Sequence, residues 1–402
     1  MLEMQLNGGV CTPKGFRGAG VKAGIKASGN HDLALLASDV PARCFGVFTL
    51  NQVKAAPVLY DQEVLSRSDR ISAVLVNSGN ANACTGPDGW ADAKRMAQVA
   101  ESALGLGKDS VLVCSTGIIG RKLPIEKIEV AVPAVHEALS HEGSEAFARA
   151  IMTTDTKMKT LGAVLTTSEG EIRIGGACKG SGMIHPNMAT MLAYITTDIE
   201  LPPTFRPEFK AWVNESFNAI SVDGDMSTND TCILLANGAS GISYHNLSLS
   251  EQGEFRRAIE SVMLELALMI VRDGEGATRM VEIRVEKATS KDDARKIGRF
   301  VCTSNLVKTA MFGQDPNWGR ILSSAGSAGG ELIADRTDLF FEDVQVLRGG
   351  RPLDVDYTRL REVVARKEYR ITLVLNMGDS SASSYTCDLS YDYVKINAEY
   401  TT

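Results

Sequence analysis

Two hydrophobic periodicities alternate along this 402-residue chain, and they restrict it to a mixed α/β fold. Short aliphatic and β-branched runs, most of them bounded by turn residues, predict strands at residues 73–76, 111–113, 192–196, 233–235, 281–285 and 371–375. Apolar residues spaced three and four apart predict helices at residues 91–104 and 251–272. We therefore expect a layered α/β protein with helices packed outside its sheets, although the sequence does not give the strand order.

Two of these segments carry more specific local signals. Val281, Ile283 and Val285 alternate with charged residues, which predicts a strand with one buried and one half-exposed face. Ser248 and Glu251 have the spacing of a capping box, which predicts a helix that begins directly after Ser248.

The charge balance bears on the classes of partner that the chain can bind. Its net charge is −7 and its pI is about 5.5, so it lacks the basic footprint that a nucleic-acid partner requires. Residues 1–11 contain neither a basic segment nor an apolar segment of the secretory type, and no apolar run approaches the roughly 18 residues of a membrane span. We therefore expect a cytoplasmic protein with no nucleic-acid or membrane partner.

The cysteines and histidines do not form a recognisable metal-binding or disulfide pattern. Eight cysteines are scattered along the chain without a C-x-x-C pair, and five histidines are dispersed without an H-E-x-x-H pattern. We expect free, buried thiols, and we expect neither a metal ion nor a cofactor.

Several common catalytic motifs are absent. Residues 18–24 (GAGVKAG) resemble a dinucleotide fingerprint only loosely, because the glycine spacing is wrong and no apolar strand precedes them, so we expect a glycine turn there. The chain has no Walker A sequence and no G-x-S-x-G elbow. These observations argue against a dehydrogenase, a nucleotide hydrolase and a serine hydrolase.

One segment carries a candidate nucleophile. Residues 179–198 (KGSGMIHPNMATMLAYITTD) place Thr190 behind the small residue Ala189 and a glycine-rich loop, at the mouth of a predicted strand. A threonine hydroxyl needs an adjacent base, and its own α-amine can serve if the preceding peptide bond is cut. The amine has a reference pKa of about 7.7–8.0, which suits a general base. On spacing alone, an ordinary threonine at the surface or at the edge of a strand is by far the commoner case.

Longer strings make the pattern more specific. The segment around Thr190 is accompanied by residues 76–86 (VNSGNANACTG), 114–120 (CSTGIIG), 216–231 (SFNAISVDGDMSTNDT), 273–279 (DGEGATR) and 303–321 (TSNLVKTAMFGQDPNWGRI). Together these strings resemble the ornithine acetyltransferase family, also called the bifunctional glutamate N-acetyltransferases of arginine biosynthesis. The resemblance spans essentially the whole chain.

The resemblance implies a self-processing acyltransferase of the N-terminal-nucleophile type. Cleavage between Ala189 and Thr190 would give an α chain of residues 1–189 and a β chain of residues 190–402, assembled as an α2β2 heterotetramer. The implied reaction moves an acetyl group from N2-acetylornithine to glutamate by a ping-pong mechanism through an acyl-threonine. Whether acetyl-CoA also serves as an acetyl donor stays open.

The resemblance also implies roles for individual residues. Thr190 is the nucleophile and also contacts the substrate, while Thr116 and Gly117 form the oxyanion hole through a hydroxyl and a backbone N–H. The residues implied to contact the amino-acid substrate are Thr153, Lys179, Glu275, Asn397 and Thr402. The choice among Thr153, Thr154 and Thr156 stays open, because all three occur in the same short string.

The residue types suit this chemistry. A Thr-Gly turn after a strand can direct two donors at a developing oxyanion, and a lysine suits the α-carboxylate that both amino acids carry. The structural alternatives are a solvated Lys179, a Glu275 that serves as a turn residue or pairs with Arg272, and a chain end that takes no part. At the level of function, the alternatives are an N-terminal-nucleophile hydrolase and a non-catalytic amino-acid-binding protein.

Overall fold

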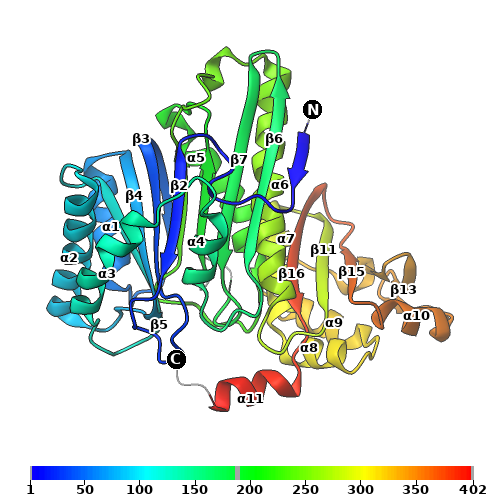
Figure 1. Ribbon diagram of the computed structural model, residues 1–402. Helices are drawn as coiled ribbons and strands as arrows, with labels where there is room; N and C mark the ends of the chain where they lie inside the picture. The colour runs from blue at the N-terminus through cyan, green and yellow to red at the C-terminus, as the bar shows by residue number, and fades with distance from the viewer. Residues whose placement is uncertain (1, 186–190, 400–402) are drawn as a thin grey trace.

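The computed structural model describes residues 2–185 and 191–399, and within them two β-sheets carry helices on their faces (Figure 1). The larger sheet has nine strands in the order β1-β6-β7-β8-β10-β3-β4-β5, with β2 paired to β3. Its strands are β1 (Leu2–Gln5), β2 (Phe16–Val21), β3 (Leu33–Phe48), β4 (Arg70–Asn80), β5 (Val111–Ile118), β6 (Lys159–Thr167), β7 (Gly170–Lys179), β8 (Leu192–Thr197) and β10 (Thr231–Ala236).

Among the described residues, the second sheet has seven strands in the order β14-β13-β12-β15-β11-β16-β9. These strands are β9 (Ile220–Ser221), β11 (Met280–Ala288), β12 (Asp338–Phe341), β13 (Val344–Arg348), β14 (Arg351–Pro352), β15 (Glu368–Val374) and β16 (Ser380–Cys387). Figure 1 shows this sheet beside the green strands of the larger sheet, with α6 between them.

The α-helices are α1 (Ala56–Arg67), α2 (Gly86–Leu104), α3 (Ile125–Glu137), α4 (Ser144–Ile151), α5 (Arg206–Glu215), α6 (Leu249–Arg272), α7 (Lys291–Thr303), α8 (Asn305–Phe312), α9 (Trp318–Gly326), α10 (Tyr357–Val364) and α11 (Tyr391–Glu399). Helices α1 to α3 lie together on the side of the larger sheet that ends in β5, and α4 packs on β2 and β3 (Figure 1). Helix α6 contacts β6 and β7 of the larger sheet and β16 of the smaller one. The layered α/β architecture is therefore confirmed.

The strand and helix predictions agree with the structure. The six predicted strands fall on β4, β5, β8, β10, β11 and β15, and the two predicted helices fall on α2 and α6. Ser248 accepts the Glu251 N–H, and the Glu251 carboxylate accepts the Ser248 N–H at 3.0 Å, so the capping box is confirmed. On β11, Val281 is fully buried while its neighbour Glu282 is half-buried, which confirms the alternation.

Helix α6 holds strand β7 in place by close packing. Its apolar face, which includes Phe255, Val262 and Leu266, is fully buried, and each such side chain contributes about 1.5–3 kcal/mol on leaving water. A Cβ at Gly176 of β7 would lie only 2.6 Å from Leu266 Cδ1, so the glycine lets the helix approach the strand. This contact positions the end of β7, where Lys179 lies.

Two local predictions are wrong. Residues 18–24 are not simply a glycine turn, because Gly18 and Gly20 belong to β2, and only Gly24 has a positive φ, of 78°. A Cβ at Gly20 would lie 2.0 Å from the Ala146 carbonyl oxygen, so the glycine lets α4 pack on the strand. All eight cysteines are free, but Cys84 is exposed rather than buried, because it lies in the turn between β4 and α2 with φ 57°.

No described helix is long and apolar enough to cross a bilayer. Residues 2–185 and 191–399 contain no group of three or more His, Cys, Asp or Glu side chains that could hold a metal ion.

Candidate active site

Strand β8 begins two residues after the predicted nucleophile. Ala189 and Thr190 themselves lie outside the described residues. Met191 is buried and is fixed to the neighbouring strand, because its N–H donates to Asp230 Oδ1 at 3.0 Å and its carbonyl accepts the Thr231 N–H at 3.1 Å. Burial raises the pKa of Asp230 well above its usual range, although the Met191 N–H and the charge of Lys179 act in the opposite direction. The chain is therefore anchored directly after the predicted cleavage junction.

Thr116 and Gly117 lie at the end of β5, where the strand pairs with the end of β4. Gly117 has φ 131°, and a Cβ there would lie 2.4 Å from the carbonyl carbon of Gly79, so only glycine fits this position. The Asn229 side-chain amide donates to the backbone carbonyl of Ser115 at 2.8 Å, which holds the strand just before the turn. The Thr116 side chain is buried beside this fixed backbone.

Lys179 ends β7 and reaches the same turn. The residue is 3% exposed, and its ammonium group donates to Thr116 Oγ1 at 3.3 Å. Burial lowers the pKa of Lys179, although Asp155 opposes this shift. Its burial rules out the solvated alternative. Among the residues that the structure describes, no carboxylate forms a direct ion pair with Lys179, although the charges of Asp155, Glu275 and Asp230 act on it at longer range. Because the Thr116 oxygen accepts from Lys179, its own hydrogen is free to be donated elsewhere.

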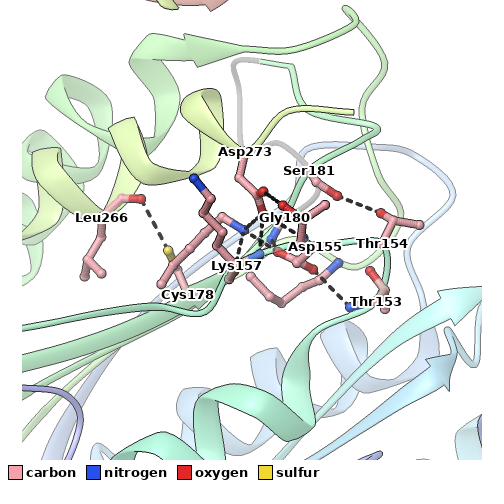
Figure 2. A network of polar contacts seen from close by, with 12 residues as sticks. Thr153, Thr154, Asp155, Lys157, Cys178, Gly180, Ser181, Leu266 and Asp273 are labelled. Atoms are coloured by element: carbon pink, nitrogen blue, oxygen red, sulfur yellow. Dashed lines mark hydrogen bonds and ion pairs between the residues drawn. The ribbon is translucent and has the colours of Figure 1, made fainter. Parts of the chain in front are cut away.

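A buried charge network lies next to the end of β7, and Figure 2 shows its members Asp155, Gly180 and Asp273. Lys159 is 1% exposed, and its Nζ donates to Asp155 Oδ1 at 2.7 Å and to Asp273 Oδ2 at 2.6 Å. Asp155 also accepts the backbone N–H of Gly180 at 2.7 Å. Burial alone would raise the pKa of Asp155, but the charges of Lys159 and Lys179 lower it overall. The network connects the segment before β6, the segment after β7 and the segment after α6.

The three candidate threonines differ in their hydrogen-bond partners in and beside this network. The Thr153 N–H donates to Asp155 Oδ2 at 3.0 Å, and the Thr154 hydroxyl is 2.7 Å from the Ser181 hydroxyl (Figure 2). The Thr156 hydroxyl instead donates to Asp273. Thr153 and Thr154 line the pocket described below, whereas Thr156 does not.

Glu275 and Asn397 meet although they lie far apart in the sequence. Asn397, on α11, donates from Nδ2 to Glu275 Oε2 at 2.9 Å. The Glu275 N–H donates to the Ser181 carbonyl at 2.8 Å, which ties Glu275 to the segment that follows Lys179. Arg272 pairs with Glu265 and Glu368. No ion pair joins Arg272 to Glu275 in the described part of the chain.

One pocket, with about 580 Å³ of empty volume, joins these groups. Its walls include all six predicted site residues that the structure describes, namely Thr116, Gly117, Thr153, Lys179, Glu275 and Asn397. The other lining residues are Ile119, Thr154, Gly182, Met183, Ser227 and Asn229. The remaining predicted site residues, Ala189, Thr190 and Thr402, lie outside the described residues.

Sequence reasoning missed the groups that hold the pocket in shape. Asp273 lies in the same short string as Glu275, and Asp155 lies in the threonine-rich string, but nothing in the sequence indicates that both reach Lys159. Asn229 and Asp230 lie in the STNDT string, which contributes to the family resemblance, but the resemblance implied no role for either residue. The signal in the sequence that could have indicated Asn229 and Asp230 is the run of polar residues directly before the apolar strand β10.

Comparison with known proteins gives the family. The family model described as ArgJ matches residues 17–402. The arginine biosynthesis bifunctional protein ArgJ of Geobacter sulfurreducens is 48% identical over 391 residues, which cover 97% of this chain and 99% of that protein. The protein of the same name from Symbiobacterium thermophilum is 46% identical over 400 residues, which cover 99% of each chain.

Two crystal structures are also similar. One is the arginine biosynthesis bifunctional protein ArgJ of Bacillus halodurans, with 37% identity over 47% of this chain and 98% of that chain and a TM-score of 0.43. The other is the ornithine acetyltransferase of Mycobacterium tuberculosis complexed with ornithine, with 43% identity over 46% of this chain and 98% of that chain and a TM-score of 0.43. On the sequence matches, which cover essentially its whole length and confirm the resemblance to the ornithine acetyltransferases, this chain belongs to the ArgJ family of arginine biosynthesis.

Proposed function

We propose that this protein cuts itself before Thr190 and then uses Thr190 to carry an acetyl group from N2-acetylornithine to glutamate. Family membership makes the chain an acetyltransferase of arginine biosynthesis. The cleavage, the nucleophile and the order of the steps are our proposal. The cut would give chains of residues 1–189 and 190–402, which we propose assemble as α2β2 in the cytoplasm without a metal ion or cofactor.

The observation that carries the proposal is the single pocket that six predicted residues share. Thr116 and Gly117 lie at a strand end, Lys179 lies at another, and Glu275 and Asn397 come from distant segments. Met191, the residue after the proposed nucleophile, is anchored through Asp230, which neighbours Asn229 of the pocket wall. Donors, a cation and a carboxylate thus surround one cavity.

The first half-reaction follows from these groups. The α-amine of Thr190 takes the hydroxyl proton as the hydroxyl oxygen attacks the acetyl carbon of acetylornithine. The Thr116 hydroxyl and the Gly117 N–H stabilise the oxyanion, and Lys179 strengthens the hydroxyl as a donor by donating to its oxygen. The C–N bond then breaks, the protonated amine returns its proton to the departing ornithine nitrogen, and the acetyl group remains as an ester on Thr190.

The second half-reaction reverses these steps with glutamate. Its free α-amine attacks the acetyl ester, and the α-amine of Thr190 removes the proton from the attacking nitrogen. The bond between the acetyl carbon and Thr190 Oγ then breaks, and the protonated amine returns the proton to Oγ. One site suits both amino acids, because each presents an α-carboxylate to Lys179 and an α-nitrogen to the reacting centre. We propose that Glu275, held by Asn397, attracts the cationic end of ornithine or orients the incoming amine.

The alternative is a hydrolase of the same construction, in which water attacks the acyl-threonine. The two functions share the cut and the nucleophile, so only the products distinguish them. With acetylornithine and glutamate together, a transferase forms one acetylglutamate for each ornithine released, whereas a hydrolase forms acetate. Release of acetate at the same rate with and without glutamate would favour the hydrolase.

Variants of Thr190 test the proposal itself. Intact-mass measurement of active protein should show two pieces that correspond to residues 1–189 and 190–402. Thr190→Ala should remain one chain and lose transferase activity, while Thr190→Ser, which keeps a hydroxyl, should cleave and retain part of the activity. Normal turnover by the alanine variant, or full activity in an uncut chain, would contradict the proposal.

A further inference from the structure

One buried side chain joins the ends of the two strands at the oxyanion turn. Asn229 is 5% exposed, and its Nδ2 group donates to the carbonyl of Ala81 at 2.6 Å and to the carbonyl of Ser115 at 2.8 Å. Ser115 directly precedes Thr116 on β5, and Ala81 directly follows the last residue of β4. A single amide group therefore ties both strands at the level of the oxyanion turn.

The pairing of the two strands becomes irregular at this point. Strands β4 and β5 pair in regular parallel register as far as Gly79 and Gly117. The register then shifts at Asn80, which pairs with both Thr116 and Ile118. Where a ladder is irregular, its backbone hydrogen bonds hold the two chains less firmly in one arrangement. The bridging amide supplies additional donors where the regular ladder ends.

The amide of Asn229 has no donor left for a substrate, although the residue lines the proposed active-site pocket. Its two N–H hydrogens go to the two carbonyls, and its Oδ1 accepts the Thr228 hydroxyl at 2.6 Å. The side chain therefore acts on the backbone around it rather than on a ligand in the pocket.

The segment that carries Asn229 is itself held from the other side. Asn51 Nδ2 donates to the Met226 carbonyl at 3.0 Å, and the Thr49 hydroxyl donates to the Ser227 carbonyl at 2.8 Å. Both donors lie in the connection between β3 and α1. The bridging amide is therefore presented from a fixed backbone.

The next residue along the chain holds the other half of the proposed active site. Asp230 Oδ1 accepts the N–H of Met191 at 3.0 Å, and Met191 is joined to Thr190 by one peptide bond. Asn229 and Asp230 are themselves consecutive. One peptide unit therefore links the group that holds the oxyanion turn to the group that holds the chain after the proposed nucleophile.

We propose that Asn229 is a positioning residue for acetyl transfer, which holds the Thr116 hydroxyl and the Gly117 N–H at the place that the oxyanion requires. The inference rests on the proposed function and assigns a further residue to it. Oxyanion donors are effective because they are already in place when the charge develops, and a misplacement of about 1 Å can lower the rate about 10²-fold. Since the Asn229 amide does not bind the substrate, its loss should appear in kcat and not in KM.

The test compares Asn229→Ala with Asn237→Ala, a matched control from the other end of strand β10. Asn237 directly follows β10, and it is 7% exposed. Its Nδ2 also donates to two acceptors, the Lys14 carbonyl at 2.9 Å and the Ser38 hydroxyl at 3.2 Å, but it does not line the pocket. Kinetics with N-acetylornithine and glutamate are measured per cleaved chain, as counted by intact mass, and urea unfolding is measured for both variants.

Both variants should unfold at lower urea concentration, because each leaves a buried carbonyl without a donor. Only Asn229→Ala should also lower kcat, by about 10- to 100-fold, with KM within about threefold of wild type. The control should keep kcat within about twofold. When Thr116→Ala is already present, adding Asn229→Ala should lower kcat by at most about a third of that factor, since both changes act on the same oxyanion. Asn229→Ser, which keeps one donor, replaces the alanine variant if that does not fold.

Four results would overturn the inference. An unchanged kcat in Asn229→Ala is the first, and an equal loss of kcat in both asparagine variants, which would make the role purely structural, is the second. The third is an effect confined to KM, which would place the amide against the substrate, and the fourth is the same loss with and without the Thr116 hydroxyl. If wild-type protein does not transfer acetyl from N-acetylornithine to glutamate, the proposed function fails instead, which is a distinguishable outcome.

Discussion

Two buried lysines lie at neighbouring positions of the larger sheet and have opposite surroundings. Lys159 begins β6 and Lys179 ends β7, where Lys159 is in register with Cys178. Lys159 is 2.7 Å from one carboxylate oxygen and 2.6 Å from another, whereas the only hydrogen-bond partner of Lys179 among the described residues is the Thr116 hydroxyl, at 3.3 Å. Burial is nearly the same, 1% and 3% exposed, so the difference lies in the partners.

The comparison separates a structural cation from a functional one. Burial alone would lower the pKa of both lysines; Asp155 and Asp273 raise that of Lys159 above its usual value, while that of Lys179 stays lowered. A buried charge with two counter-ions is already satisfied and connects three segments of the chain. A buried charge without one is costly unless a ligand supplies the missing anion, and such groups gather at functional sites. We infer that the carboxylate of the amino-acid substrate completes the site around Lys179.

Lys159→Met should have the largest effect, and the effect should be on stability. The variant leaves the buried Asp155 and Asp273 without a counter-ion, so the free energy of unfolding should fall by about 3–5 kcal/mol. The pKa of Asp155 is lowered in the folded protein, so its stabilising effect is present above its unfolded pKa of about 4 and is lost as the pH falls toward the folded pKa. Urea unfolding at several pH values measures both effects.

The control for this variant is an exposed pair. Arg149 lies 2.6 Å from Glu145 on α4, with both side chains more than half exposed. Arg149→Met should cost no more than about 1 kcal/mol. An equal loss in the two variants would show that the network around Lys159 has no special structural role.

Thr116→Ala should chiefly affect catalysis. It removes the hydroxyl that we propose donates to the oxyanion, so kcat should fall about 10²–10³-fold while KM changes little. The fold should be unaffected, because Gly117 and Asn229 hold the turn through the backbone. Steady-state kinetics with acetylornithine decide the matter, and a change confined to KM would assign Thr116 to substrate binding instead.

Lys179→Met should chiefly affect binding. Loss of a charge-assisted contact to the α-carboxylate should raise KM about 10- to 100-fold. Because the pKa of Lys179 is lowered, the wild-type KM should rise as the pH increases through a value below the usual lysine range, and the variant should lack this rise. A variant with the wild-type KM at neutral pH would contradict the role that the comparison gives to Lys179.

Asn397→Ala should have the smallest effect of the series. It removes the 2.9 Å hydrogen bond to Glu275, a contact worth about 0.5–1.5 kcal/mol, so kcat/KM should fall by up to about tenfold. Because the amide lies on the exposed helix α11, the free energy of unfolding should change little. Unchanged kinetics would place α11 outside the working site.

The six strands and two helices that the sequence predicted are all present, because their signals are local. The alternation on β11 and the capping box of α6 each arise within a few residues, and both are present. Residues 18–24 were misjudged because the glycines there serve a contact with α4, more than 120 positions away, that no local pattern records. The exposed Cys84 depends in the same way on where a turn places one side chain.

The site residues also differ in how far the sequence could predict them. The predicted residues of β5 and β7 do meet Glu275 and Asn397 in one pocket. The resemblance to a family, and not a local pattern, was what linked these positions. The counter-ions of Lys159 come from positions 4 and 114 residues away, and no spacing rule links them. Likewise, no sequence pattern indicates that the Thr156 hydroxyl donates to Asp273 while Thr153 and Thr154 line the pocket.

The central claim is that Thr190 carries the acetyl group, and a trapped intermediate tests it most directly. Protein incubated with N-acetylornithine in the absence of glutamate is quenched with acid, and the 190–402 chain is mapped by mass spectrometry. The account predicts a mass increase of one acetyl group on Thr190 that disappears when glutamate is added before quenching. Intersecting double-reciprocal lines together with an unmodified Thr190 would contradict it, because they would mean direct transfer within a ternary complex.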